Sequence, residues 1–252
     1  MISDEVERFV VAEDGAKLWT VVSGSGLPVL VFNGGPGCDD YLGTVAHLIN
    51  DNCQVVRFEP RGCGRSDWDG NYGLETLLSD AETIRRAYQF GRILLLGHSA
   101  GPNVALAYAL RYPEQTSGVI GIAGGKFVDD RAWSETYRKG RDTVGEDVGG
   151  KVFHADPEVN PKGNADWKAY CQRVTIFREL ADMRTRCVFI NGSEDIRPNW
   201  PTQQLAALIP AAQYVEIQGA AHSIWLTHAQ ELQRELKNAL AYILSVNHRS
   251  NS

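Results

Sequence analysis

The feature that most constrains the fold is an apolar run that leads directly into a serine flanked by glycines. Residues 92–101 read Arg-Ile-Leu-Leu-Leu-Gly-His-Ser-Ala-Gly, and an alanine-rich helical stretch follows at 104–109. A nucleophilic serine at a sharp strand-to-helix turn needs small residues two positions away on each side, because a Cβ there would collide with the reversing backbone. Gly97 and Gly101 meet this need. The pattern predicts Ser99 at such a turn, and the competing interpretation is an ordinary glycine-bearing loop.

Along the rest of the chain, short apolar runs alternate with longer segments of helical period. This alternation is typical of a mostly parallel sheet covered by helices, so the expected fold class is α/β. We predict eight strands, at 8–11, 18–22, 28–32, 54–58, 92–96, 117–123, 187–190 and 214–217. Asp14-Gly15 predicts a hairpin turn between the first two strands. Apolar residues at helical spacing predict packing helices over 74–88 and 229–243.

The alternation is interrupted once, after the sixth strand, by about sixty residues. Such a gap is too long for an ordinary connection between neighbouring elements. Two helix-like pieces inside it, around 132–141 and 165–183, predict a small helical insertion over one end of the sheet. We therefore expect a core formed by residues 1–127 and 187–252, with a cap insertion formed by residues 128–186.

Composition excludes several classes of partner. The 31 acidic residues outnumber the 25 basic ones, and the net charge of -6 removes the attraction on which nonspecific nucleic-acid binding depends. No apolar run approaches the ~20 residues that span a bilayer, and the N-terminus lacks a secretory signal. The five cysteines include no C-x-x-C pair, so neither a disulfide framework nor a zinc site is indicated. We expect a cytoplasmic protein with a small-molecule substrate, without a metal or other cofactor, and with neither nucleic acid nor membrane as partner.

A serine hydroxyl at neutral pH is a poor nucleophile, so a base must take its proton and a carboxylate must orient that base. In sheets of this type the three residues follow the chain order serine, acid, histidine. Asp195 follows the strand at 187–190, and His222 follows the strand at 214–217. Like Ser99, both lie just past strand carboxyl ends, where open α/β sheets bind ligands. We predict Ser99 as nucleophile, His222 as base and Asp195 as the orienting carboxylate.

Other residues compete for these roles. Glu194 adjoins Asp195, and Asp129 follows an earlier strand. Asp195 itself has a plainer interpretation as a turn residue or helix cap. His98 adjoins Ser99 and should point away from it. Surface or packing roles are expected for the histidines that do not follow a late strand, which are His47, His154, His228 and His248.

A glycine-rich loop follows the strand at 28–32. It reads Asn-Gly-Gly-Pro-Gly over residues 33–37, and its glycines let the main chain approach a reacting carbon. The N–H groups of Gly35 and Ala100 would form a two-donor oxyanion hole. A phosphate-binding loop is the competing interpretation, but the chain has no G-x-x-x-x-G-K-[ST] and no G-x-G-x-x-G that opens a helix.

These motifs resemble the α/β-hydrolase superfamily over nearly the whole chain, and more narrowly its proline iminopeptidase branch. Gly-Gly-Pro-Gly at 34–37 and Arg-Gly-Cys-Gly-Arg-Ser at 61–66 are similar to two motifs of that branch. The resemblance implies an α/β-hydrolase fold with a small helical cap, the triad and oxyanion donors named above, and a structural role for residues 61–66.

The chain departs from that branch at several positions. Asn33 stands where the branch usually has histidine, and Glu59 stands where it has aspartate. His98 and Ala100 replace a glycine and an aromatic residue that the peptidases favour. The peptidases also carry a larger cap, whose glutamates hold the free amine of the substrate.

We expect a serine hydrolase that cleaves a small ester, thioester, lactone or amide through an acyl-enzyme. The nearest alternative is a proline iminopeptidase-like aminopeptidase. Lyases and cofactor-free haloperoxidases that carry the same triad are further enzymatic alternatives, because fold alone does not separate these activities. A non-catalytic ligand-binding protein on the same fold is the alternative from another class.

Overall fold

One sheet forms the centre of the protein. The computed structural model describes residues 5–128, 130–147 and 153–245. Within these ranges, eight strands lie in the order β1-β2-β4-β3-β5-β6-β7-β8. They are β1 (Val6–Val11), β2 (Lys17–Ser23), β3 (Leu27–Phe32), β4 (Cys53–Phe58), β5 (Ile93–His98), β6 (Thr116–Ile122), β7 (Cys187–Gly192) and β8 (Ala212–Ile217). The predicted strands are confirmed, with ends that differ by no more than two residues.

The sheet is parallel except at its first edge. β1 pairs antiparallel with β2 through the predicted hairpin, and β2 also pairs antiparallel with β4. All remaining pairs, from β4–β3 to β7–β8, are parallel. The carboxyl ends of the parallel strands therefore meet at one edge of the sheet, where the loops that follow β3, β5, β7 and β8 come together.

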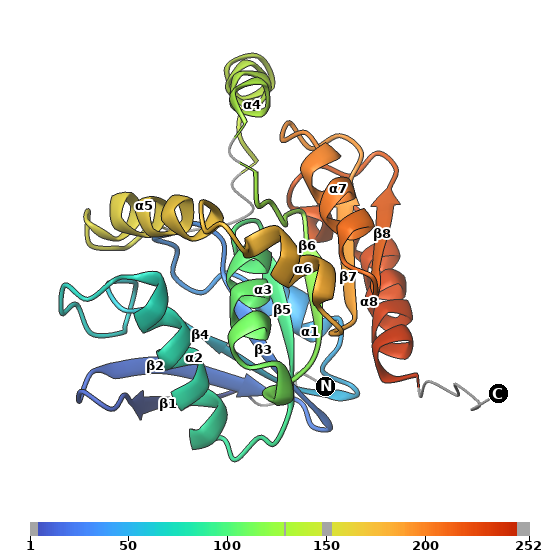
Figure 1. Cartoon of the computed structure of the whole chain (residues 1–252). Helices are drawn as coiled ribbons and strands as arrows, with labels where there is room; N and C mark the ends of the chain where they lie inside the picture. Colours follow the sequence, from blue (N-terminus) through green and yellow to red (C-terminus); the bar gives the residue numbers. More distant parts are fainter. Residues whose placement is uncertain (1–4, 129, 148–152, 246–252) are drawn as a thin grey trace.

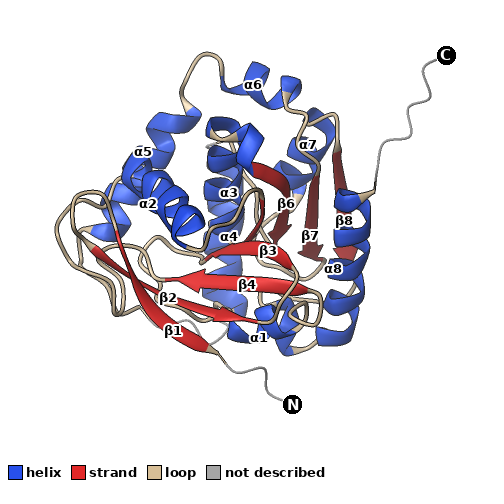
Figure 2. Ribbon diagram, turned by 90° about the horizontal axis from the view of Figure 1, so that it is seen from below, coloured by secondary structure: helices blue, strands red, loops and turns tan. Residues whose placement is uncertain are grey.

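Helices cover both faces of the sheet (Figures 1 and 2). One face carries α2 (Leu74–Ala87), α3 (Gly101–Arg111), α6 (Ile176–Asp182) and α7 (Trp200–Leu208), and the other carries α1 (Gly43–His47) and α8 (Ala229–Leu244). Leu95 of β5 packs into the first layer, whereas its neighbours Leu94 and Leu96 pack into the second. Strands buried on both faces read as continuous apolar runs, which is why the central strands could be predicted. The predicted helices over 74–88 and 229–243 are confirmed as α2 and α8.

The segment between β6 and β7 is helical. It contains α4 (Arg131–Val144), α5 (Val159–Cys171) and α6. Figure 1 shows α4 at the top, apart from the layers that cover the sheet. The prediction of one helical piece over 165–183 is wrong in its bounds. The structure has two helices there: α5, which begins earlier at Val159 and ends at Cys171, and then α6. Pro161 lies in the first turn of α5, where its missing N–H is not needed. The assignment of residues 128–186 to a cap stays a prediction.

Among the helices of the described ranges, none has the length and apolar character needed to cross a membrane.

Arg61 connects helix α2, the first hairpin and the loop at Asp69. Its buried guanidinium group binds both carboxylate oxygens of Asp80 on α2 at 2.8 Å. It also contacts Asp14 of the first hairpin at 2.5 Å and Asp69 at 2.6 Å. Burial raises the pKa of Asp80, and the contacts with Arg61 counter that effect. The Asp80 charge is therefore held in the core by one arginine.

Replacing Arg61 with methionine should lower the free energy of unfolding by about 3–5 kcal/mol, because the change leaves Asp80 buried without its cation. Urea denaturation near neutral pH measures this loss. Arg234→Met is the matched control: Arg234 is exposed and pairs with the neighbouring Glu235, so its replacement should lower the free energy of unfolding by less than about 1 kcal/mol. A loss for Arg61→Met no larger than that of the control would contradict this account of the core.

Candidate active site

Ser99 lies at the turn between β5 and α3 with a φ of 61°, in the left-handed region that a residue with a Cβ rarely adopts. Its N–H donates to the carbonyl of Ile122 on β6 at 2.9 Å, which fixes the turn. A Cβ at Gly97 would collide with the backbone of Gly101, as the sequence pattern predicts. Sequence reasoning missed Gly124, where a Cβ would overlap the carbonyl of Ser99. The only signal for this position is a pair of glycines after the sixth strand.

The three residues predicted as a triad lie together. His222 Nε2 is 3.0 Å from Ser99 Oγ, and His222 Nδ1 is 2.6 Å from Asp195 Oδ2. The side chains of His222 and Asp195 are both 1% exposed. Because a carboxylate accepts but cannot donate, His222 carries its proton on Nδ1 and presents the Nε2 lone pair to the serine hydroxyl. This tautomer allows His222 to accept the proton of Ser99.

Arg197 contacts the carboxylate of Asp195 in two ways. Its Oδ1 accepts the backbone N–H of Arg197 at 2.9 Å, and the guanidinium group of Arg197 lies 3.4 Å away. Burial raises the pKa of the Asp195 carboxyl, and both contacts with Arg197 oppose that rise. Of the competing acids, Glu194 is exposed, and Asp129 lies outside the described residues.

His98 points away from Ser99 and connects other parts of the site. Its Nε2 is 3.2 Å from the carbonyl oxygen of His222, which can only accept, so Nε2 carries the proton. Its Nδ1 then accepts from Tyr41 Oη at 2.7 Å, and Tyr41 Oη accepts the N–H of Gly34 at 2.8 Å. Burial raises the pKa of Tyr41, which keeps this hydroxyl protonated. Sequence reasoning assigned no role to Tyr41, and no local pattern indicates one.

The remaining histidines lie outside this cluster. His47 is partly exposed and 3.6 Å from Glu5. The ring of His154 contacts that of Trp68 at a tilt of 55°, and His228 forms a hydrogen bond with the neighbouring Thr227. His248 lies outside the described residues.

The two predicted oxyanion donors both line the cleft at Ser99. Gly35 has a φ of 116°, which requires glycine. The adjacent Gly34 comes so close to the serine that a Cβ there would lie 3.0 Å from Ser99 Cβ. Within the described residues, neither the N–H of Gly35 nor that of Ala100 has a protein acceptor. Both N–H groups are therefore available to a ligand in the cleft.

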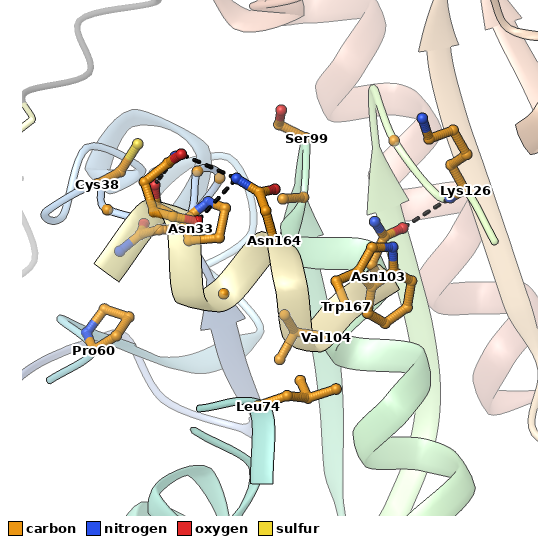
Figure 3. Close-up of a pocket in the computed structure, with 18 of the residues that line it drawn as sticks. Asn33, Cys38, Pro60, Leu74, Ser99, Asn103, Val104, Lys126, Asn164 and Trp167 are labelled. Carbon is orange, nitrogen blue, oxygen red and sulfur yellow. Dashed lines mark hydrogen bonds between the residues drawn. The ribbon is translucent and has the colours of Figure 1, made fainter. Parts of the chain in front are cut away.

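The cleft has a volume of about 630 Å³ and lies between the carboxyl edge of the sheet and the helices that follow β6. Figure 3 shows Leu74 and Val104 below Ser99 in this view, with Asn103 and Lys126 to its right. Lys126 Nζ lies 3.6 Å from the centre of the Trp133 ring. The lining thus combines apolar side chains with amides and a few charged groups. In the parts of the chain that the structure describes, no cluster of three or more histidine, cysteine or carboxylate side chains could hold a metal ion.

Sequence comparison points to one family. The profile of the alpha/beta hydrolase fold family matches residues 28–155. The proline iminopeptidase of Saccharolobus solfataricus is 38% identical over 109 residues, which cover 41% of this chain and 35% of that protein. The proline iminopeptidase of Neisseria gonorrhoeae is 30% identical over 184 residues, which cover 59% of this chain and 56% of that protein. The chain therefore spans roughly a third to just over half of the length of these curated relatives.

Structural comparison agrees on the fold. A thermophilic esterase from Thermogutta terrifontis superposes with a TM-score of 0.75 and 21% sequence identity, covering 96% of this chain and 100% of that one. At such low identity, the similarity shows the fold alone. Since the profile matches half of the sequence and nearly the whole chain superposes on a solved esterase, the protein belongs to the alpha/beta hydrolase fold family.

Proposed function

We propose that the protein is a serine hydrolase that cleaves a small ester, thioester, lactone or amide. The observation that carries this proposal is the continuous hydrogen-bonded line from Asp195 through His222 to Ser99, with distances of 2.6 and 3.0 Å. Two N–H groups without a protein acceptor in the described residues line the same cleft and support it. A binding protein without activity would need neither feature.

The reaction proceeds through an acyl-enzyme. Ser99 Oγ bonds to the carbonyl carbon of the substrate while its proton passes to His222 Nε2, and Asp195 stabilises the imidazolium. The N–H groups of Gly35 and Ala100 bind the oxyanion of the tetrahedral intermediate. When the intermediate collapses, the bond to the leaving group breaks and His222 gives that group its proton. Water then attacks the acyl-enzyme with His222 as base, which releases the acid and restores Ser99.

The charges around the cleft support esters over N-terminal proline peptides. Burying the free amine of a peptide costs several kcal/mol unless a carboxylate pairs with it. Among the described residues, the carboxylates that line the cleft are Asp80, Glu146 and Asp195. Asp80 binds Arg61, and Asp195 binds His222. Glu146 bonds to Arg197 and accepts the hydroxyl of Tyr137.

Five further acids between β6 and β7 are also poorly placed to hold an amine. Asp147 accepts the N–H of Ser223, Asp156 accepts the hydroxyl of Tyr72, and Glu179 pairs with Arg173. Glu135 and Glu158 are exposed. None of these five lines the cleft in the described structure. Proline iminopeptidase activity is the second candidate because both sequence relatives named above carry that name.

We expect p-nitrophenyl butyrate to be cleaved with a kcat/KM at least ~10-fold above that of proline p-nitroanilide, equivalent to ~1.4 kcal/mol of transition-state binding. Esters have the better leaving group and need no amine site. Initial rates for the two substrates, with Ser99→Ala protein as the background, measure this ratio.

The peptidase assignment replaces the esterase assignment if the proline substrate is preferred and blocking its amine abolishes cleavage. A fluorophosphonate probe distinguishes the non-catalytic alternative, because it labels Ser99 only where that serine is activated. Absence of labelling together with absence of hydrolysis would overturn the proposed function.

A further inference from the structure

The glycine-rich loop that carries Gly35 rests on helix α5. Asn160 Nδ2, in the first turn of α5, donates to the carbonyl oxygen of Pro36 at 2.8 Å. One turn later, Gly163 faces the ring of Pro36, and a Cβ at Gly163 would lie 2.6 Å from Pro36 Cγ and 2.9 Å from Pro36 Cβ. The helix backbone and the loop are therefore in direct contact.

Glycine inside α5 calls for an explanation. In the interior of a helix, glycine is less favourable than alanine by about 0.8–1.0 kcal/mol. Gly163 needs no unusual backbone conformation, since its φ is not positive. The ring of Pro36 is fused to its own backbone and cannot rotate away from an added methyl group. The close approach of Pro36 thus accounts for Gly163, and a side chain there would push the loop itself.

α5 is fixed to the core independently of that loop. Asp166 Oδ2 accepts the N–H of Leu74 in the first turn of α2 at 3.0 Å. The stretch that precedes α5 bonds to the 61–66 segment, with Asp156 N–H donating to the carbonyl of Gly62 at 2.8 Å. Tyr72 Oη donates to Asp156 Oδ2 at 2.9 Å. Because Arg61 anchors the same segment to α2 and to the first hairpin, α5 provides a firm support.

We propose that Asn160 and Gly163 are positioning residues for the oxyanion hole, which they set by holding Pro36 and hence the adjacent N–H of Gly35. This inference rests on the proposed function, in which that N–H binds the oxyanion. Oxyanion donors work only when they lie about 2.7–3.1 Å from the developing charge. A misplacement of about 1 Å costs ~10²-fold in rate. An added Cβ at Gly163 would lie 2.6 Å from Pro36 Cγ, so relief of that contact would move the loop by a distance of this order.

The test is Gly163→Ala, assayed with p-nitrophenyl butyrate. We expect kcat to fall ~10–100-fold with KM within ~2-fold of wild type, because the loop contributes to the transition state more than to substrate binding. The melting temperature checks that the variant is folded, because the gain from alanine in the helix opposes the cost of the contact with Pro36. Gly91→Ala is the matched control, because a Cβ at Gly91 would have no neighbour within 4 Å and Gly91 is not among the residues that line the cleft.

Two further measurements separate positioning from a structural effect. A trifluoromethyl ketone forms a tetrahedral oxyanion adduct with the serine, so its inhibition constant should rise by about the same factor as kcat falls. Asn160→Ala adds no atoms and removes the bond to Pro36, and it should lower kcat in the same direction without changing KM. If Gly163→Ala protein is unstable, the kinetics of Asn160→Ala protein test the proposal by themselves.

The inference is overturned if both variants keep kcat and ketone inhibition within ~2-fold of wild type. It is also overturned if KM rises while kcat is unchanged, since the helix would then contact substrate rather than support the loop. In either case the proposed function stands, provided that wild-type protein hydrolyses the ester and Ser99→Ala protein does not. Failure of the proposed function appears instead as a wild-type rate equal to that of Ser99→Ala.

Discussion

Replacing Ser99 with alanine should lower kcat for a p-nitrophenyl ester at least ~10³-fold while leaving the fold intact. The substitution removes the hydroxyl that bonds to the carbonyl carbon, and His222 then has no serine proton to accept. Alanine keeps the Cβ that the turn already accommodates at a φ of 61°, so the β5–α3 turn should be preserved. Steady-state kinetics measure the loss, and thermal unfolding followed by circular dichroism checks the fold.

Ser79→Ala provides the matched control. Ser79 lies on α2, partly buried, and is not among the residues that line the cleft. Its replacement should leave kcat within ~2-fold of wild type. A folded Ser99→Ala protein that retains wild-type turnover would remove the central claim of a serine nucleophile.

Asp195→Asn should lower kcat by on the order of 10³–10⁴-fold near neutral pH. The reason lies in the backbone N–H of Arg197, which donates to Asp195 Oδ1 at 2.9 Å. Asparagine offers one acceptor and one donor, and the acceptor must face that N–H. Its NH₂ group then points at His222 Nδ1, which forces the imidazole proton to Nε2. In this tautomer His222 donates to Ser99 and cannot take its proton.

Steady-state kinetics measure the effect of Asp195→Asn, and thermal unfolding checks the fold, as for Ser99→Ala. Asp142→Asn is the control, because Asp142 is exposed on α4, pairs with the neighbouring Arg141 and is not among the residues that line the cleft. A loss below ~10-fold for Asp195→Asn would show that another group orients His222, and Asp195 would then have only its turn-forming role.

The strand-to-helix turn could be predicted because part of its constraint is local. A Cβ at Gly97 would collide with the backbone of Gly101, four residues later, and an apolar run marks the strand that leads into the turn. The constraint on Gly101 is not local, because a Cβ there would meet the carbonyl oxygen of Phe32 on β3. Asp195 and His222 required one more step. Parallel strands bring their carboxyl ends to a common edge, so the position of each residue after a late strand was informative. The sequence could place all three residues at that edge but could not predict the distances between them.

Contacts between distant segments escaped prediction. Asn160 and Pro36 are 124 residues apart, and Tyr41 and His98 are 57 apart. Neither pair has a local pattern, because each contact depends on how a loop and another element meet in three dimensions. Gly124 was missed for the same reason, since the atom that it must avoid belongs to Ser99 in the turn after β5. The start of α5 was misplaced because a proline in a first turn resembles one in a loop.

At position 99, stability and activity favour different residues. Glycine adopts the left-handed conformation freely, whereas a residue with a Cβ is disfavoured there by roughly 1–2 kcal/mol. A chain improved only for thermal resistance would therefore gain from glycine at this turn and would lose its hydroxyl. The same reasoning applies to laboratory evolution. Selection for heat resistance alone should replace Ser99 with glycine, whereas selection for turnover should keep the serine.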